Sequence, residues 1–139
     1  MSWQVLLMEL PAEAQCMKQV PLDYRTDSLG DRALLASRLE EALPGVEFED
    51  PSWGAINGDG FSIQIDLGEQ SEVDSVTLHV QGGGSDAFKT IWDATRALGV
   101  RALDVTTGEL LNFSQDGDEI RVRRGLDHDV VLDSEDSVF

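Results

Sequence analysis

Residues 61–67 read Phe-Ser-Ile-Gln-Ile-Asp-Leu, an alternation of apolar and polar side chains along the whole stretch. Successive side chains of a β-strand point to opposite faces of the sheet, so this pattern predicts a strand with one buried and one solvated face. Residues 76–81, Val-Thr-Leu-His-Val-Gln, repeat the pattern. Together the two stretches predict a sheet that buries one face in a core and leaves the other face wet.

A first helix is predicted before these strands, over residues 31–43. Leu35, Leu39, Ala42 and Leu43 recur there at helical spacing and would form one buried stripe. Asp27 or Ser28 is expected to cap the start of this helix, because their side-chain oxygens accept hydrogen bonds from free backbone N–H groups. The dipeptide Pro44-Gly45 is expected to end it.

A second helix is predicted after the strands, from the N-cap Ser85 to the stop at Gly99. The glycines before it give the run Gly82-Gly83-Gly84-Ser85-Asp86-Ala87, which satisfies the pattern of a dinucleotide-binding turn, and Asp104 follows at the end of the next strand. A carboxylate at Asp86 would oppose a pyrophosphate at the helix start. We therefore interpret the glycines as a sharp turn and predict no cofactor.

The remaining chain predicts further strands. Residues 3–10 form a nearly continuous apolar run, typical of a strand that is buried on both faces or lies in the centre of a sheet. Residues 46–56 are interpreted as one strand interrupted at Pro51, and Asn57-Gly58-Asp59-Gly60 as a hairpin turn. A short strand is expected at 100–105.

The resulting order is strand-helix-strand-strand-strand-helix-strand. It predicts an α+β fold of the ferredoxin-like type, an antiparallel sheet with both helices on one face. The expected domain covers residues 1–113. Residues 114–139 carry eight acidic side chains and are expected to be a loosely attached tail that holds at most one edge strand, at 119–123.

The charge of the chain narrows the classes of partner. Among 139 residues, 27 are acidic and 10 basic, which gives a formal net charge of -17. Such a surface repels phosphate backbones and anionic lipid, so we expect no nucleic acid and no membrane as partners and favour a basic protein. No apolar run reaches the roughly 20 residues of a membrane span, and no basic region opens the chain, so the expected location is cytoplasmic.

No catalytic or metal site is predicted. Asp127-His128-Asp129 with Asp133, Glu135 and Asp136 combines carboxylates with a histidine, but it lies in the expected tail, where nothing would hold the ligands in place. Cys16 is the single cysteine and has no nearby base to activate it. The protein is therefore expected not to be an enzyme.

A partner-binding surface is predicted from Glu47, Glu49, Asp50 and Trp53, since an aromatic side chain ringed by carboxylates is typical of a hot spot for a cationic partner. The alternative is that Trp53 packs into the core. The polar face of the predicted sheet, with Asp66 and His79, is expected to extend this surface. These two residues also support a second hypothesis, in which they act as a proton-transfer pair in a small-molecule-binding or enzymatic domain.

The run Val76-Thr77-Leu78-His79-Val80-Gln81-Gly82-Gly83-Gly84, the helix after it, and Ala102-Leu103-Asp104 through Gly108-Glu109 resemble small acidic bacterial proteins that act as immunity partners in polymorphic toxin systems. The likeness covers roughly residues 1–113 and transfers no functional residue. It implies a cytoplasmic, non-enzymatic protein that binds and neutralises a basic toxin or nuclease. The open sheet and its edge strands also permit a homo-oligomer.

Overall fold

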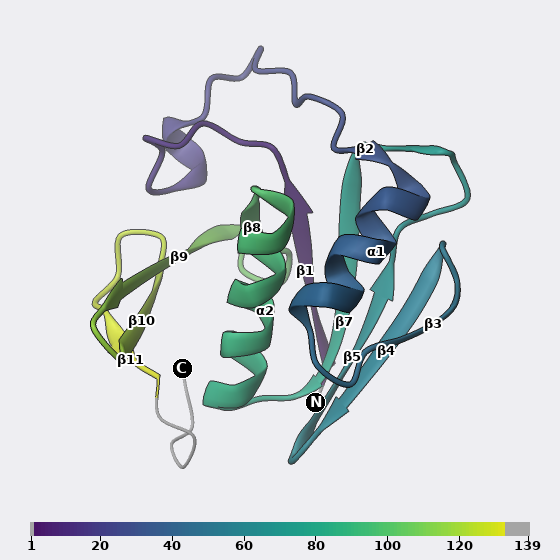
Figure 1. The fold of residues 1–139 in the computed structure, drawn as a ribbon. Helices are drawn as coiled ribbons and strands as arrows, with labels where there is room; N and C mark the ends of the chain where they lie inside the picture. Colours follow the sequence, from purple (N-terminus) through teal and green to yellow (C-terminus); the bar gives the residue numbers. More distant parts are fainter. Residues whose placement is uncertain (1, 133–139) are drawn as a thin grey trace.

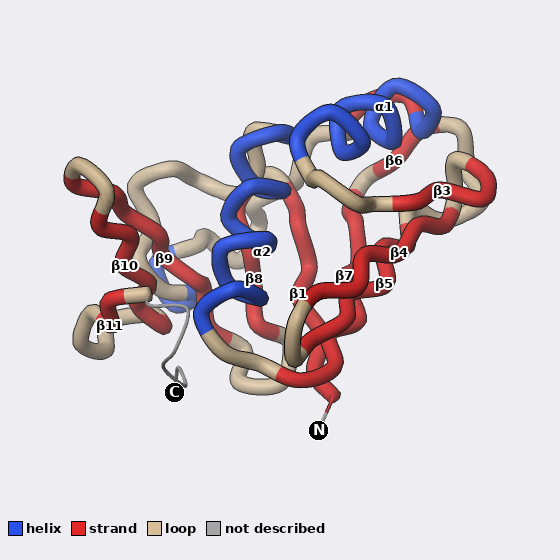
Figure 2. The backbone as a smooth tube through the Cα atoms, turned by 60° about the horizontal axis from the view of Figure 1, so that its bottom comes forward, coloured by secondary structure: helices blue, strands red, loops and turns tan. Residues whose placement is uncertain are grey.

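The computed structural model describes residues 2–132 and shows an α+β fold with two helices on one face of a large antiparallel sheet (Figure 1). The sheet has nine strands in the order β11-β10-β9-β8-β1-β7-β5-β4-β3, and a separate two-stranded sheet pairs β2 with β6. Both helices lie on the same side of the sheet in the rotated view of Figure 2 as well. No helix within residues 2–132 has the length and apolarity that a membrane crossing requires.

The strands of the described chain range from two to eight residues in length. They are β1 (Ser2–Met8), β2 (Gly30–Asp31), β3 (Glu47–Asp50), β4 (Trp53–Gly58), β5 (Phe61–Asp66), β6 (Glu72–Val73), β7 (Ser75–Gly82), β8 (Arg101–Asp104), β9 (Glu109–Asp116), β10 (Glu119–Arg124) and β11 (Val130–Val131). A short 3-10 helix, η1, spans Met17–Gln19.

Helix α1 spans Arg32–Ala42, close to the expected range, but its cap is neither Asp27 nor Ser28. Asp31 is the N-cap, and its side chain accepts a hydrogen bond from the N–H of Leu34 at 3.2 Å. The predicted caps lie too early because residues 29–31 first extend to pair β2 with β6. The helix therefore begins only where that short pairing ends.

Helix α2 spans Ser85–Leu98, as the apolar stripe predicted. Its N-cap is Gly84 rather than Ser85, and Gly99 ends it in the left-handed conformation at φ 66°. Gly82 has φ 81°, and a Cβ there would lie 2.3 Å from the carbonyl oxygen of Gly60. A side chain at this position would therefore collide with the β4–β5 turn, which gives this glycine a packing role.

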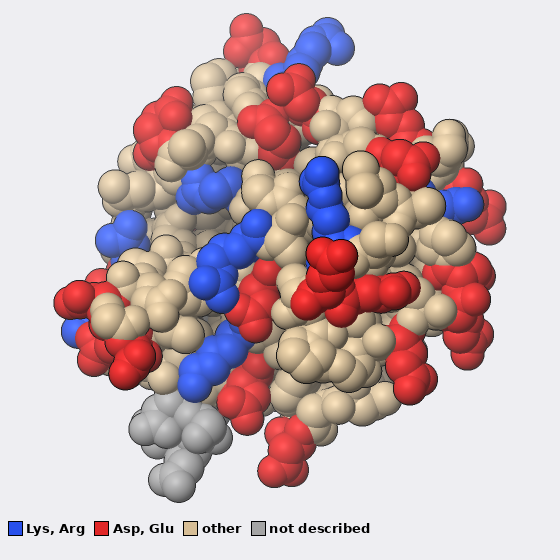
Figure 3. Space-filling model, viewed as in Figure 1, with Lys and Arg blue, Asp and Glu red and all other residues tan. Residues whose placement is uncertain are grey.

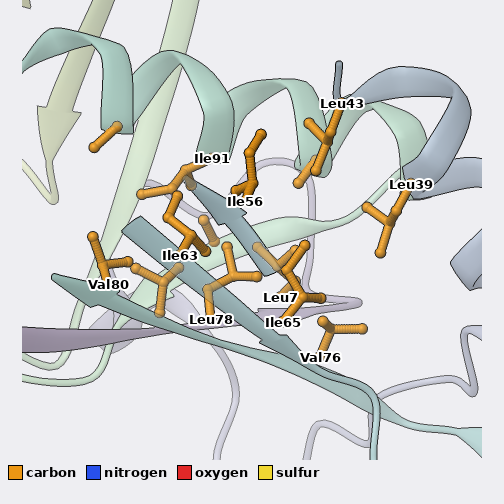
Figure 4. Close-up of a cluster of buried hydrophobic side chains, with 14 of the residues drawn as sticks. Leu7, Leu39, Leu43, Ile56, Ile63, Ile65, Val76, Leu78, Val80 and Ile91 are labelled. Carbon is orange, nitrogen blue, oxygen red and sulfur yellow. The ribbon is translucent and has the colours of Figure 1, made fainter. Parts of the chain in front are cut away.

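The main core lies between the helices and the sheet. Figure 4 shows side chains from the helices meeting those of the central strands, with Leu39 from α1, its C-cap residue Leu43, and Ile91 from α2. Ile63 and Ile65 of β5 point into this core, as their alternation predicted, while their neighbours Ser62, Gln64 and Asp66 do not. The alternation at 61–67 therefore assigned the two faces of this strand correctly.

Two expectations about the strand order are corrected. Residues 46–56 form two strands, β3 and β4, because Asp50-Pro51-Ser52 makes a tight turn instead of a kink. Four main-sheet strands therefore separate the helices where three were expected. Beyond β8, three more strands widen the sheet to nine, so the strand-helix order written for a ferredoxin-like fold is not the order of this chain.

Residues 114–132 are packed against the rest of the protein, which differs from the loosely attached tail that the composition suggested. The expected boundary falls inside β9, and β10 pairs with β9 from Glu119 to Arg124. Val122 is 0% exposed in the main core, and Arg124 forms an ion pair with buried Asp104 at 3.0 Å. The strand expected at 119–123 is therefore present as β10, but it lies between β9 and β11 instead of at the edge of the sheet. Residues 133–139 lie outside the described part of the chain.

The chain between β1 and β2 covers part of the face away from the helices. A second apolar cluster forms there around Leu10, Ala14 and Leu110. Arg101 ties this segment to the sheet: its guanidinium donates to the carbonyl oxygens of Pro11 at 2.6 Å and Ala14 at 2.8 Å, and to Asn112 Oδ1 at 2.7 Å. The segment covers β8, β9 and the Met8 end of β1, so the rest of β1 and the strands from β7 to β3 keep this face open.

Candidate functional site

The uncovered sheet face is built from polar residues in register across five strands. Residues paired on neighbouring antiparallel strands place their side chains on the same face, with Cβ atoms about 4.5–5.5 Å apart. Two adjacent rows run from β1 to β3 in this way. The first row is Gln4, His79, Gln64, Ala55 and Glu47, and the second is Leu6, Thr77, Asp66, Trp53 and Asp50.

Trp53 is a surface residue of this face and does not belong to the core. Its side chain is 37% exposed, whereas its strand neighbours Gly54 and Ile56 face the helices and are buried. Trp53 leads β4 and stands in register between Asp66 on one side and Asp50 on the other. The packing alternative considered for this tryptophan is therefore not what the structure contains.

His79 lies beside Trp53 on the diagonal of the two rows. The ring centroids of the two side chains are 6.2 Å apart, with an interplanar angle of 34°. Gln4 Nε2 lies 3.3 Å from His79 Nδ1, so Nδ1 accepts this hydrogen bond when the ring carries its proton on Nε2. A hollow of about 420 Å³ opens next to His79 and is lined by Gln4, Gln64 and the β8–β9 turn, among others.

Asp66 and His79 share the open face but are not hydrogen-bonded to each other. Asp66 Oδ1 accepts a hydrogen bond from the N–H of Gly68 at 2.9 Å, while His79 is bonded to Gln4. A proton-transfer pair needs the two groups within hydrogen-bond reach. The arrangement therefore favours two separate surface contacts over an acid–base pair.

The other predicted acidic residues occupy different positions. Glu47 lies on the open face, opposite Ala55. Asp50 accepts hydrogen bonds from both the backbone N–H and the hydroxyl of Ser52; these bonds, and secondarily the charge of Arg32, hold its pKa below the usual value. Asp50 thus shapes the β3–β4 turn. Glu49 lies at the irregularity of β3, where the pairing gives it no partner residue.

Cations are missing from the stretch of chain that forms most of this face. Residues 39–88 contain 11 acidic residues and no lysine or arginine. On the helix side of the molecule, by contrast, lysines and arginines lie among the carboxylates (Figure 3). The charge of -17 is thus unevenly distributed along the chain, and the strands from β3 to β7 are uniformly negative or neutral.

Metal-binding side chains do not gather into a site in the described part of the chain. Within residues 2–132, no group of three or more His, Cys, Asp or Glu side chains is placed to hold a metal ion. Asp133, Glu135 and Asp136 of the predicted acidic cluster lie outside the described residues. Cys16 is buried as a free thiol.

Sequence reasoning missed Gln4, whose amide contacts His79. Strand β1 lies in the centre of the sheet, one of the two alternatives predicted for residues 3–10, but it is not buried on both faces: Gln4 and Leu6 point to the open face while Val5 and Leu7 are fully buried. The single polar residue between Trp3 and Val5 was the signal that this strand, too, has a wet side.

Comparison with known proteins assigns no family. No protein-family model, no curated protein and no solved structure matches the chain. The functional argument therefore rests on the geometry and charge of the open face alone.

Proposed function

We propose that the protein is a non-enzymatic module that binds a basic protein through its open sheet face, in the manner of an immunity-type inhibitor of a bacterial toxin or nuclease. One observation carries the proposal: an exposed Trp53 stands between carboxylates on a face whose strands β3 to β7 belong to a 50-residue stretch without a lysine or arginine. An aromatic side chain surrounded by negatively charged residues is typical of a hot spot for a cationic partner.

The charge and topology support the associated expectations. A net charge of -17 disfavours nucleic acid as a partner, and the same acidity would accelerate association with a basic protein. A bacterial cytoplasmic location follows from the immunity-type role. The neighbouring strands β8-β1-β7-β5, with a helix after β1 and another after β7, support the interpretation of this central part as ferredoxin-like.

A small-molecule site on the same face is the second candidate, and the hollow of about 420 Å³ beside His79 is the observation in its favour. The acid–base pair of Asp66 and His79 that this candidate would use is not formed, since Asp66 accepts a hydrogen bond from the N–H of Gly68 instead. The two candidates differ in their sensitivity to salt, since a neutral small molecule gains nothing from the acidic face.

The test is a comparison of baits in a pull-down from the native cell. Wild-type protein is compared with Glu47→Gln and Trp53→Ala, and with Leu126→Ala as the control, which removes an exposed leucine at the opposite end of the sheet. We expect a basic protein to bind the wild type and the control but to be retained less by the two open-face variants. Recovery that is the same for all four baits would refute the proposal.

Kinetics on the recovered pair then separate charge from contact. Glu47→Gln should slow association and weaken its salt dependence, whereas Trp53→Ala should mainly speed dissociation. Trp53→Ala should remain folded, with a melting temperature near that of the wild type, because the side chain is a surface residue. An association rate indifferent to salt would remove the electrostatic argument.

A further inference from the structure

The three tryptophans of the chain are partnered in different ways. The Trp92 ring stacks on Phe113 with centroids 5.9 Å apart. The guanidinium of Arg96 also lies over the Trp92 ring, with Cζ 4.1 Å from the ring centroid. Arg96 Nη2 also forms an ion pair with Asp93 Oδ1 at 2.5 Å. On α2 the protein thus combines an indole, an arginine and an aspartate in one surface cluster.

Trp3 is also satisfied within the chain. Its indole N–H donates to the carbonyl oxygen of Gly82 at 3.0 Å, and its ring lies 5.3 Å from that of Phe88. The ring of Trp92 and both the ring and the N–H of Trp3 therefore have partners within the chain.

The surroundings of Trp53 resemble the α2 cluster in pairing an indole with an aspartate, but no arginine lies over the Trp53 ring in the described residues. Asp66 stands next to it in register, and Glu47 lies on the same face one row away. No cation–aromatic contact and no hydrogen bond of the indole N–H is formed at Trp53 within residues 2–132. Arg32, a cation at this end of the sheet, donates to the carbonyl oxygen of Gly68 at 3.2 Å, and its charge also acts on Asp50.

We propose that Trp53 and Asp66 form a slot for an arginine side chain of the basic partner. The guanidinium stacks on the exposed indole, and its edge donates hydrogen bonds to the Asp66 carboxylate, as Arg96 does with Trp92 and Asp93 on α2. Glu47 adds negative charge on the same face. This inference rests on the proposed function, because it specifies which side chain of the partner the open face selects.

Arginine fits this slot better than lysine for a geometric reason. The guanidinium is planar, so it can stack on an aromatic ring and at the same time present a fork of N–H donors to a carboxylate. A lysine ammonium is a compact, strongly hydrated charge that gains the Coulomb attraction but not the stacking. The open face should therefore distinguish two partners of equal charge.

The experiment uses two peptides of equal length and charge, one alternating glycine with arginine and the other glycine with lysine. Binding to the full chain is followed by NMR on the indole N–H signals, with Trp53→Phe assigning that of Trp53. We expect the arginine peptide to bind about two- to five-fold more tightly, the range of an exposed cation–aromatic contact, and to shift the Trp53 signal most.

Two variants and two controls make the test specific. Trp53→Ala should reduce the arginine preference to about one-fold, and Asp66→Asn should reduce it while keeping the oxygen that accepts from Gly68. Asp59→Asn removes an equal charge at the β4–β5 turn, and Leu126→Ala removes an exposed apolar side chain at the opposite end of the sheet; both should keep the preference.

The outcomes separate this inference from the proposed function. Equal binding of both peptides, lost at high salt, would overturn the arginine slot and leave a basic partner standing. A preference that survives Trp53→Ala would also overturn it. Binding of neither peptide to the wild type would count against both the slot and the affinity of this face for basic proteins.

Discussion

Replacing Val122 by alanine should destabilise the whole protein, because this β10 side chain is 0% exposed in the main core. The change removes two methyl groups at about 0.8 kcal/mol each, and the remaining cavity brings the expected loss to about 2–3 kcal/mol. In a domain of this size 1 kcal/mol corresponds to about 3–4 °C, so the melting temperature should fall by about 6–12 °C.

Val131→Ala is the matched control. It makes the same chemical change on the adjacent strand β11, but at a side chain that is 43% exposed. Its cost should stay below about 0.5 kcal/mol, as for most surface substitutions. Both variants and the wild type are compared by thermal and urea denaturation followed by circular dichroism, with the urea midpoint and slope measured separately.

The result that would refute this reasoning is a Val122→Ala variant whose melting temperature lies within about 2 °C of the Val131→Ala control. Residues 119–132 would then not be packed as β10 and β11 in solution. The loosely attached segment that the composition suggested would be the better description.

Three further predictions concern the segment between β1 and β2. The Tyr24 hydroxyl donates a hydrogen bond to the Glu9 carboxylate, and this bond raises the pKa of Tyr24 to about 12. Because Tyr24 is the single tyrosine, the absorbance titration of the protein should have a midpoint near 12 in the wild type and move toward 10 in Glu9→Gln. The same bond lowers the pKa of Glu9, so Tyr24→Phe should lower the melting temperature at neutral pH. As the pH falls below the ordinary carboxyl pKa, the melting temperatures of Tyr24→Phe and the wild type should converge. A difference in melting temperature that stays the same at acid pH would contradict this assignment. Arg101→Met should free residues 11–15, seen as faster amide exchange there than in the matched surface variant Arg38→Met, and equal exchange in the two would show that the Arg101 hydrogen bonds do not hold the segment.

Local pattern was enough for the elements whose two faces differ in polarity. The alternation at 61–67 and 76–81 predicted β5 and β7 with the correct side in the core, and the apolar stripe with Gly99 predicted α2. These predictions succeeded because burial of one face is encoded in neighbouring residues, with a period of 2 or 3.6. The mixed α+β class with an antiparallel sheet and two helices followed from their order.

Other elements depend on partners distant in the chain. Val122 is buried because β9 and β10 extend the sheet beyond β8; the local alternation predicts a strand there but not that its Val122 side packs into the main core. The same holds for Asp31, which caps α1 only because β2 first pairs with β6, more than 40 residues further along the chain. Composition alone made the segment after residue 114 look solvated.

For the candidate site, the chemical character could be predicted from the sequence. The net charge of -17, the stretch from 39 to 88 without lysine or arginine, and a tryptophan that follows three carboxylates closely in the sequence all indicate an acidic surface with an aromatic residue. Only the tertiary structure decided which of these groups share a surface. Strand pairing sets Trp53 beside Asp66 and on the diagonal of His79, and turns Asp50 toward Ser52. The physical reason is that register joins residues far apart in sequence, and a shift of one residue would move each side chain to the opposite face of the sheet.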